Sequence, residues 1–91
     1  YQSSKAALSM LTKSAALEMA KYNIRVNTIS PGLTCTSGNR EQWENNSDVW
    51  QQRTSNIPLG RAGQPEDCVG AAVYLASDHA KWVTGTNIII D

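Results

Sequence analysis

The sequence has too few cysteine and histidine residues for a disulfide framework or a zinc site. Its only cysteines are Cys35 and Cys68, and His79 is the single histidine. A structural zinc site needs four such ligands, and a disulfide scaffold needs several cysteine pairs. We therefore expect reduced thiols, no bound metal and a cytoplasmic protein.

An excess of one charge and long apolar runs are also missing. Eight Lys and Arg residues balance eight Asp and Glu residues, so the formal net charge is zero. No basic stripe is available to follow a phosphate backbone, which argues against nucleic acid as a partner. No apolar run approaches the ~20 residues that span a bilayer, and the first residues do not form a signal peptide. We expect no membrane partner.

The composition that remains is that of a globular protein, but the chain is short. Apolar residues make up 41% of its 91 residues. A chain of this size would bury only roughly 60–65% of its unfolded surface. It begins on Tyr1 without an initiator Met and ends on Asp91, directly after the strand-like run Ile88–Ile90. We therefore expect a segment of a larger domain, incomplete on its own.

Apolar spacing predicts two helices and two strands. Residues 3–22 are rich in alanine, and apolar residues recur at three- and four-residue steps, which predicts a helix. Residues 24–30 alternate as in a short strand that ends at the turn Pro31–Gly32. A second helix opens at residues 64–67, with Pro at its first turn and two acidic residues, and ends near Ser77.

The final strand is predicted over residues 87–90. Its three consecutive isoleucines are typical of a strand covered on both faces. Between the first strand and the second helix, residues 33–57 show no clear period. We expect a long loop there, with one or two helical turns around residues 41–52. The order of these elements indicates an α/β fold with a parallel sheet.

Tyr1 and Lys5 are the residues that point to chemistry. At four-residue spacing they lie on one face of the first helix, about one turn apart. A phenol with a pKa of about 10 is a poor acid or base at neutral pH. A nearby ammonium group and the positive end of a helix both stabilise the phenolate, so the pair could transfer a proton to or from an alcohol. Taken alone, this spacing is also common by chance.

The whole chain resembles the C-terminal part of a short-chain dehydrogenase/reductase, starting at the catalytic tyrosine of that family. The resemblance rests on five motifs in order: the Tyr1–Lys5 pair, IRVNTISPG at residues 24–32 with Thr36, PLGR at residues 58–61, GQPED at residues 63–67 and VTGT at residues 83–86. It implies the C-terminal portion of one Rossmann-like, doubly wound domain that binds NAD or NADP. The full enzyme would transfer a hydride between that cofactor and an alcohol or carbonyl substrate.

The resemblance also implies roles for individual residues. Tyr1 matches the general acid/base, and Lys5 matches the lysine that lowers its pKa and holds the nicotinamide ribose. Pro31 and Gly32 match the turn that walls the nicotinamide. The carboxamide would be bound by the main chain at residue 34 and the side chain at residue 36, which are Thr34 and Thr36.

Residues 37–57 match the substrate lid of the family. Trp43 and Trp50 are seven apart, so they share one face if the stretch is helical. They would either cover the substrate or pin the lid to the body of the protein. The many amides and hydroxyls of the lid suit a sugar or polyol better than a long acyl chain.

Several family features have no counterpart in these 91 residues. The Gly-rich turn that binds the dinucleotide is absent, and so are the catalytic serine and asparagine. We therefore expect the isolated chain to be inactive, and the full enzyme to be a homo-oligomer, either a dimer or a tetramer. Two alternatives stay open: a truncated, inactive chain that acts only as an oligomerisation or structural module, and a pseudogene product without function.

Overall fold

The computed structural model describes residues 2–91, in which an α-helix precedes the first strand and three α-helices separate it from the second. The main elements are α1 (Gln2–Met19), β1 (Thr28–Pro31), α2 (Arg40–Asn45), α3 (Ser47–Thr54), α4 (Val69–Ala76) and β2 (Asn87–Ile90). Short 3-10 helices cover Ala20–Tyr22, Ser37–Asn39, Pro65–Cys68 and Asp78–Ala80. Tyr1 lies outside the described residues.

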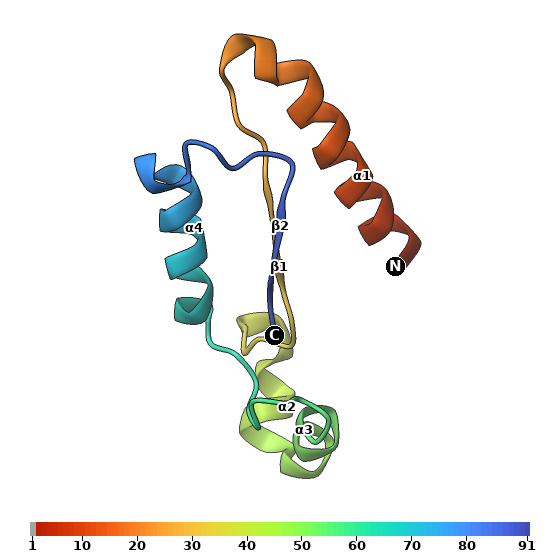
Figure 1. Ribbon diagram of the computed structural model, residues 1–91. Coiled ribbons are helices and arrows are strands. Elements are labelled where there is room, and N and C mark those ends of the chain that lie inside the picture. The colour runs from red at the N-terminus through yellow and green to blue at the C-terminus, as the bar shows by residue number, and fades with distance from the viewer. Residues whose placement is uncertain (1) are drawn as a thin grey trace.

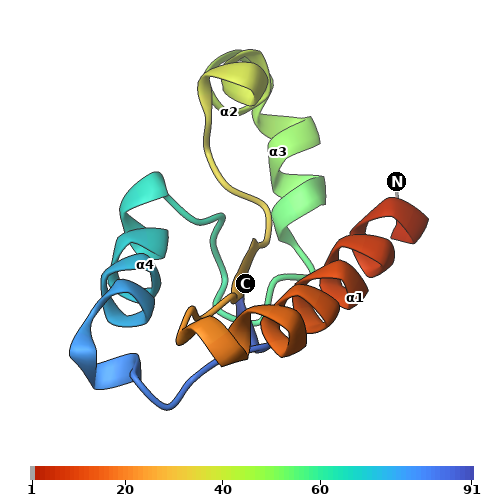
Figure 2. The ribbon, with the colours of Figure 1, turned by 90° about the horizontal axis from the view of Figure 1, so that it is seen from above.

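β1 and β2 pair in parallel to form a two-stranded sheet, which confirms the predicted fold class. The register runs from Thr28 opposite Asn87 to Pro31 opposite Ile90. α1 and α4 flank the strands on either side, while α2 and α3 lie beyond the end at which both strands finish (Figures 1 and 2). The segment connecting the strands therefore places α2 and α3 beyond the end of the sheet and α4 on one side, while α1, which precedes β1, covers the other side.

The first strand is shorter than the alternation predicted. It covers Thr28–Pro31, whereas the pattern predicted a strand over residues 24–30. The reason is the length of its partner, because β2 begins only at Asn87. Residues before β1 are held by the turn at residues 83–86 instead: the Val26 N–H donates to Thr84 Oγ1 at 3.1 Å, and the Gly85 N–H donates to the Val26 carbonyl at 2.8 Å.

α1 is fixed to the sheet through small side chains. The hydroxyls of Thr12 and Thr28 are 2.6 Å apart, and Thr12 Oγ1 also donates to the Leu8 carbonyl at 3.0 Å. One turn further along, Ala16 is buried and faces Gly85, where an added Cβ would lie 3.5 Å from the Ala16 Cβ. The alanine-rich composition of this helix therefore allows a close approach to the turn before β2.

α4 begins with a reciprocal N-terminal cap. In the 3-10 turn that precedes it, the Asp67 N–H donates to the Gln64 main-chain carbonyl at 2.9 Å, and the Asp67 carboxylate accepts from the Gln64 N–H at 2.7 Å. Pro65 occupies the first turn, as its missing N–H allows. The helix start predicted at residues 64–67 is confirmed.

The described residues contain little apolar core. The buried apolar residues are the small side chains Ala16, Ala62 and Ala80. Ile89 in β2 is 65% exposed, so the prediction of a final strand covered on both faces is not met within residues 2–91. Val73 on α4 is 61% exposed, and Leu11 on α1 is 63% exposed. The reason is the same in each case: a sheet of two strands offers too little surface to cover these side chains.

The dimensions of the chain agree with this lack of a core. Its radius of gyration is 16.0 Å, whereas a compact domain of this length would measure about 12 Å. The exposed hydrophobic side chains on α1 and α4 would need more protein surface to be buried, and residues 2–91 do not provide it. Within the described part of the chain, no helix has the length and apolar character needed to cross a membrane.

The turn before β2 gives a test of this arrangement. Gly85 has φ of +72°, a conformation that costs an L-residue about 1–2 kcal/mol. We expect Gly85→Ala to lower the free energy of unfolding of the full-length protein by about that amount in urea titrations, and Gly85→Asn to lower it less, because Asn tolerates the left-handed region. Both variants add the same Cβ beside Ala16. Equal losses of unfolding free energy in the two variants would therefore show that the cost comes from contact of the new Cβ with Ala16, not from the left-handed backbone conformation.

Candidate functional site at the end of the parallel strands

A cleft of about 730 Å³ opens where β1 ends. Residues from five different parts of the chain line it: Lys5, Pro31, Gly32, Leu33, Thr34, Thr36, Asn39, Arg53, Pro65 and Cys68. β1 and β2 are parallel, so their carboxyl ends meet at this edge of the sheet. Ligands of open α/β sheets bind outside the carboxyl ends of the strands. The position of the cleft therefore makes it the candidate binding site.

Five residues singled out from the sequence come together in this cleft. Lys5 reaches it from the first turn of α1, and Pro31 and Gly32 follow directly from β1. Thr34 and Thr36 continue along the same wall. The candidate acid/base Tyr1 lies outside the described residues, one helical turn before Lys5 in sequence. The juxtaposition of α1 with the segment after β1 is a tertiary feature that the motif spacing alone does not give.

A backbone ladder holds the cleft wall after β1. Thr34 and Gly63 form an isolated parallel bridge, in which the Gly63 N–H donates to the Leu33 carbonyl at 2.8 Å and the Cys35 N–H donates to the Gly63 carbonyl at 2.9 Å. Thr34 Oγ1 donates to the Gly32 carbonyl at 3.0 Å. Within residues 2–91, the Thr34 N–H has no acceptor. This donor is therefore available to a ligand or to water.

Asn39 is a cleft residue that the motifs did not single out. Its amide Nδ2 donates to the Thr34 carbonyl at 2.8 Å, and its Oδ1 accepts from the Thr36 N–H at 2.8 Å. Thr36 and Asn39 thus form a capping box around the 3-10 turn that opens the lid region. The Thr-x-x-Asn spacing in the sequence was the signal that could have identified it.

The two tryptophans of the lid region lie on different helices. Trp43 is on α2 and Trp50 on α3, because the chain breaks at Asn46, whose side chain accepts from the Val49 N–H at 3.5 Å and starts α3. A shared face on one helix is therefore not formed. The Trp43 indole N–H donates to the Thr36 carbonyl at 3.1 Å, which pins α2 to the cleft wall. Neither indole is among the described residues that line the cleft.

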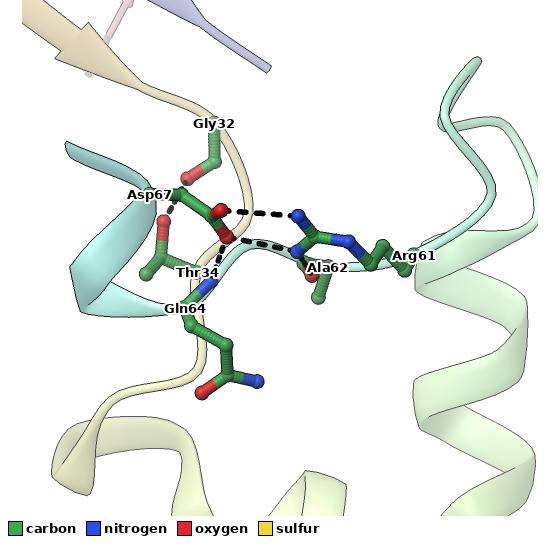
Figure 3. Close-up of polar contacts among 6 residues, drawn as sticks. All are labelled: Gly32, Thr34, Arg61, Ala62, Gln64 and Asp67. Carbon is green, nitrogen blue, oxygen red and sulfur yellow. Dashed lines mark hydrogen bonds and ion pairs between the residues drawn. The ribbon is translucent and has the colours of Figure 1, made fainter. Parts of the chain in front are cut away.

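A clasp between Arg61 and Asp67 closes the loop that carries Gly63 (Figure 3). The guanidinium and the carboxylate meet in two parallel contacts, from Nη1 to Oδ2 at 2.8 Å and from Nη2 to Oδ1 at 3.0 Å. Arg61 Nη1 also donates to the Ala62 carbonyl at 2.9 Å. These contacts tie Arg61 to the loop between α3 and α4. The clasp holds Gly63 at the bridge to Thr34.

The electrostatics of the clasp affect its acid side chain. The hydrogen bond from Arg61, together with the one from the Gln64 N–H, lowers the pKa of Asp67 from 3.8 to about 2. Both side chains are exposed to solvent, so the pKa of Asp67 is lowered by the two parallel contacts with Arg61 and not by burial.

The groups around the cleft suit a nicotinamide cofactor. The wall offers an unpaired N–H at Thr34, the hydroxyl of Thr36 and the ammonium of Lys5, and the described lining contains no acidic side chain. Those groups are the donors that a carboxamide oxygen and ribose hydroxyls require. At residue 32 an added Cβ would lie 2.6 Å from the Asp91 Cβ, so the glycine lets the main chain after β1 pass close to the residue after β2.

A protein-family model and two characterised dehydrogenases each match this chain over its whole length. A sequence model described as enoyl-(acyl carrier protein) reductase matches residues 1–91. L-Rhamnose 1-dehydrogenase (NAD(P)(+)) of Azotobacter vinelandii is 40% identical over 91 residues, which are all of this chain and 35% of that enzyme. 3β-Hydroxysteroid dehydrogenase 1 of Eggerthella lenta is 45% identical over 91 residues, again all of this chain and 34% of that enzyme.

A solved structure agrees with the fold. 4-Hydroxyisoleucine dehydrogenase complexed with NADH superposes with a TM-score of 0.90 at 44% identity, over 98% of this chain and 36% of that one. The chain therefore spans about a third of the length of the proteins it matches.

The clasp predicts a measurable effect on cofactor binding. Asp67→Asn removes the charge and one acceptor from Arg61, which loosens the loop at Gly63 and the wall at Thr34. We expect the Kd for NADH, from fluorescence titration of the full-length protein, to rise by roughly 2- to 5-fold. Glu44→Gln makes the same charge change at the exposed Arg40–Glu44 pair and serves as the control. Equal effects of the two variants would contradict a positioning role for the clasp.

The lowered pKa of Asp67 sets the pH range over which the clasp contributes to stability. Because its folded-state pKa lies below its ordinary value, the contribution is complete above about pH 4 and is lost as the pH falls toward 2. We expect the difference in unfolding free energy between the unmodified protein and Asp67→Asn to shrink over that range in urea titrations. A difference that stays constant from pH 5 to pH 2.5 would show that the Asp67 carboxylate does not stabilise the fold.

Proposed function

The chain belongs to the short-chain dehydrogenase/reductase family, and on this premise we propose that it is the C-terminal segment of an NAD(P)-dependent oxidoreductase. The whole protein would interconvert an alcohol and a carbonyl compound. The observation that carries the proposal is the convergence of Lys5, Pro31, Gly32, Thr34 and Thr36 on one cleft at the carboxyl end of β1. The geometry supports the family match, because residues that the resemblance singled out from separate parts of the sequence lie together.

In the proposed mechanism, Tyr1 holds or releases the proton of the substrate hydroxyl. As a phenolate it would accept that proton during oxidation, and as a phenol it would return it during reduction. Lys5, one helical turn away in sequence, would stabilise the phenolate and lower the pKa of Tyr1. When bound, a nicotinamide cofactor supplies the acceptor or donor of the hydride.

The segment after β1 would hold the nicotinamide end of the cofactor. Pro31 and Gly32 would wall the ring, and the Thr34 N–H and the Thr36 hydroxyl would bind the carboxamide. Lys5 would also donate to the ribose hydroxyls. The unpaired Thr34 N–H supports this assignment, because the bridge to Gly63 directs it away from the neighbouring backbone. No residue that would choose between NAD and NADP is among those that line the cleft.

Residues 37–57, which include α2 and α3, would form the substrate lid. Its first turn begins at the cleft wall, and Trp43 ties it there through the Thr36 carbonyl. Trp50 would have the same anchoring role through α3. The amide and hydroxyl side chains of the lid favour a polar alcohol such as a sugar or polyol, and a sugar dehydrogenase is among the relatives. A steroid dehydrogenase of similar identity shows that relatives alone do not decide the substrate.

A second candidate function is that of a non-catalytic assembly module. The exposed apolar side chains favour it, among them Leu17 on α1, which is 81% exposed. The same exposure also agrees with a homo-oligomeric enzyme in which these faces are covered. NAD(P)-dependent turnover by the full-length protein distinguishes the two, since a pure assembly module would show none.

Substitution of the proposed acid/base tests the catalytic assignment. We expect Tyr1→Phe to lower kcat of the full-length enzyme by about 10²- to 10⁴-fold, because the phenyl ring cannot exchange the substrate proton. The Kd for NADH should change little. Lys5→Met should instead move the pH dependence of kcat to higher pH, because the phenolate loses its neighbouring charge. Retained activity in Tyr1→Phe would refute the assignment.

A further inference from the structure

One cation in the cleft has no role in the proposed mechanism. The described lining contains two positively charged side chains, Lys5 and Arg53, and no acidic one. Lys5 is accounted for by Tyr1 and the ribose. Arg53 comes from the last turn of α3, inside the proposed lid. An anionic ligand would be attracted to this pair of charges, whereas a neutral one would leave Arg53 without an ionic partner.

Neutral groups hold Arg53 in place. Its Nη1 donates to the amide oxygen of Gln42 at 2.6 Å, and its guanidinium carbon lies 5.9 Å from the centre of the Trp50 ring. The bond to Gln42 joins α3 to α2, so the position of Arg53 depends on both lid helices. Neither partner neutralises the guanidinium, and one contact leaves several of its five N–H donors for a ligand.

Two of the other three arginines of the described chain form ion pairs, and the third, Arg25, lies outside the cleft and donates to the Val83 carbonyl at 3.5 Å. Arg40 meets Glu44 at 2.9 Å on α2, and Arg61 meets Asp67 at 2.8 Å in the clasp. No acidic side chain lies within ion-pair distance of Arg53 among residues 2–91. A planar guanidinium oriented by an amide and an aromatic ring, with its charge uncompensated and facing a cleft, is suited to bidentate binding of a carboxylate.

We propose that Arg53 binds a carboxylate of the substrate, so that the enzyme acts on a hydroxy acid or the corresponding oxo acid. This inference rests on the proposed function, which it refines by naming the substrate class. The place of Arg53 on the lid, apart from the wall at residues 31–36, favours the substrate over the cofactor as its partner. Gln42 is a positioning residue that orients the guanidinium.

The test compares acids with matched neutral alcohols. The full-length enzyme is assayed with NAD⁺ and NADP⁺ on hydroxy acids of three to six carbons, each paired with the alcohol in which CH₂OH replaces the carboxylate. We expect a higher kcat/KM for the acids. Arg53→Gln should lower kcat/KM for the acids by roughly 10- to 100-fold, mainly by raising KM. It should change kcat/KM for the neutral alcohols by less than about 2-fold.

Three further variants separate the role of Arg53 from general effects. Arg40→Gln removes a lid charge that is paired with Glu44. It should leave unchanged the ratio of kcat/KM for the acids to kcat/KM for the alcohols. Arg53→Lys keeps the charge but not the planar fork, so an intermediate loss is expected. Gln42→Ala should raise KM for the acids less than Arg53→Gln does, because it removes only the orienting contact.

The outcomes distinguish this inference from the proposed function. Oxidation of the neutral alcohols alone would overturn the inference and leave the proposed function intact. A raised Kd for NADH in Arg53→Gln, with acids and alcohols affected equally, would assign Arg53 to the cofactor phosphates and overturn it as well. An unchanged preference for acids in Arg53→Gln would show that the carboxylate is bound elsewhere. Absence of turnover with every substrate and both cofactors would refute the proposed function itself.

Discussion

The parallel pairing of β1 with β2 is the constraint on which the rest of the structure depends. It fixes the point at which β1 ends, and everything that lines the cleft is placed relative to that end. The ladder does not stop with the strands, because the bridge between Thr34 and Gly63 continues it by one more contact. The main chain after Gly32 is therefore held extended along the cleft, and the Thr34 N–H is left unpaired within the described residues.

Three separate devices support this wall from outside the sheet. The Arg61–Asp67 clasp holds the loop that contributes Gly63, Asn39 binds the residues on both sides of Cys35, and the Trp43 indole anchors α2 to Thr36. The hydrogen bond between Thr12 and Thr28 fixes α1 to the start of β1, and the first turn of α1 places Lys5 at the cleft beyond the other end of the strand. The site is thus held by hydrogen bonds along its main-chain side, and the side chain of Arg53 from the lid helix α3 lines the same cleft.

The sequence predicted the parts of this arrangement that depend on local pattern. Helical periodicity, the Pro31–Gly32 turn and the isoleucine run placed α1, the end of β1 and β2, and the motif resemblance named the residues that meet in the cleft. It could not give the break at Asn46, which depends on a side-chain cap, or the exposure of Ile89, which depends on surface beyond a two-stranded sheet. Arg53 was missed because its significance comes from tertiary neighbours, not from spacing. Tyr1 lies outside the described residues, so its role stays a prediction.

A crystal structure of the full-length protein with NADH or NADPH bound is the decisive experiment for the cleft at the end of β1. We expect the nicotinamide ring to lie against Pro31 and Gly32, its carboxamide oxygen to accept from the Thr34 N–H, and the Lys5 ammonium to donate to the ribose hydroxyls. The Tyr1 hydroxyl should point to the face of the ring that carries the hydride. A nicotinamide bound away from the end of β1, or a Thr34 N–H still without a ligand in that complex, would contradict this expectation.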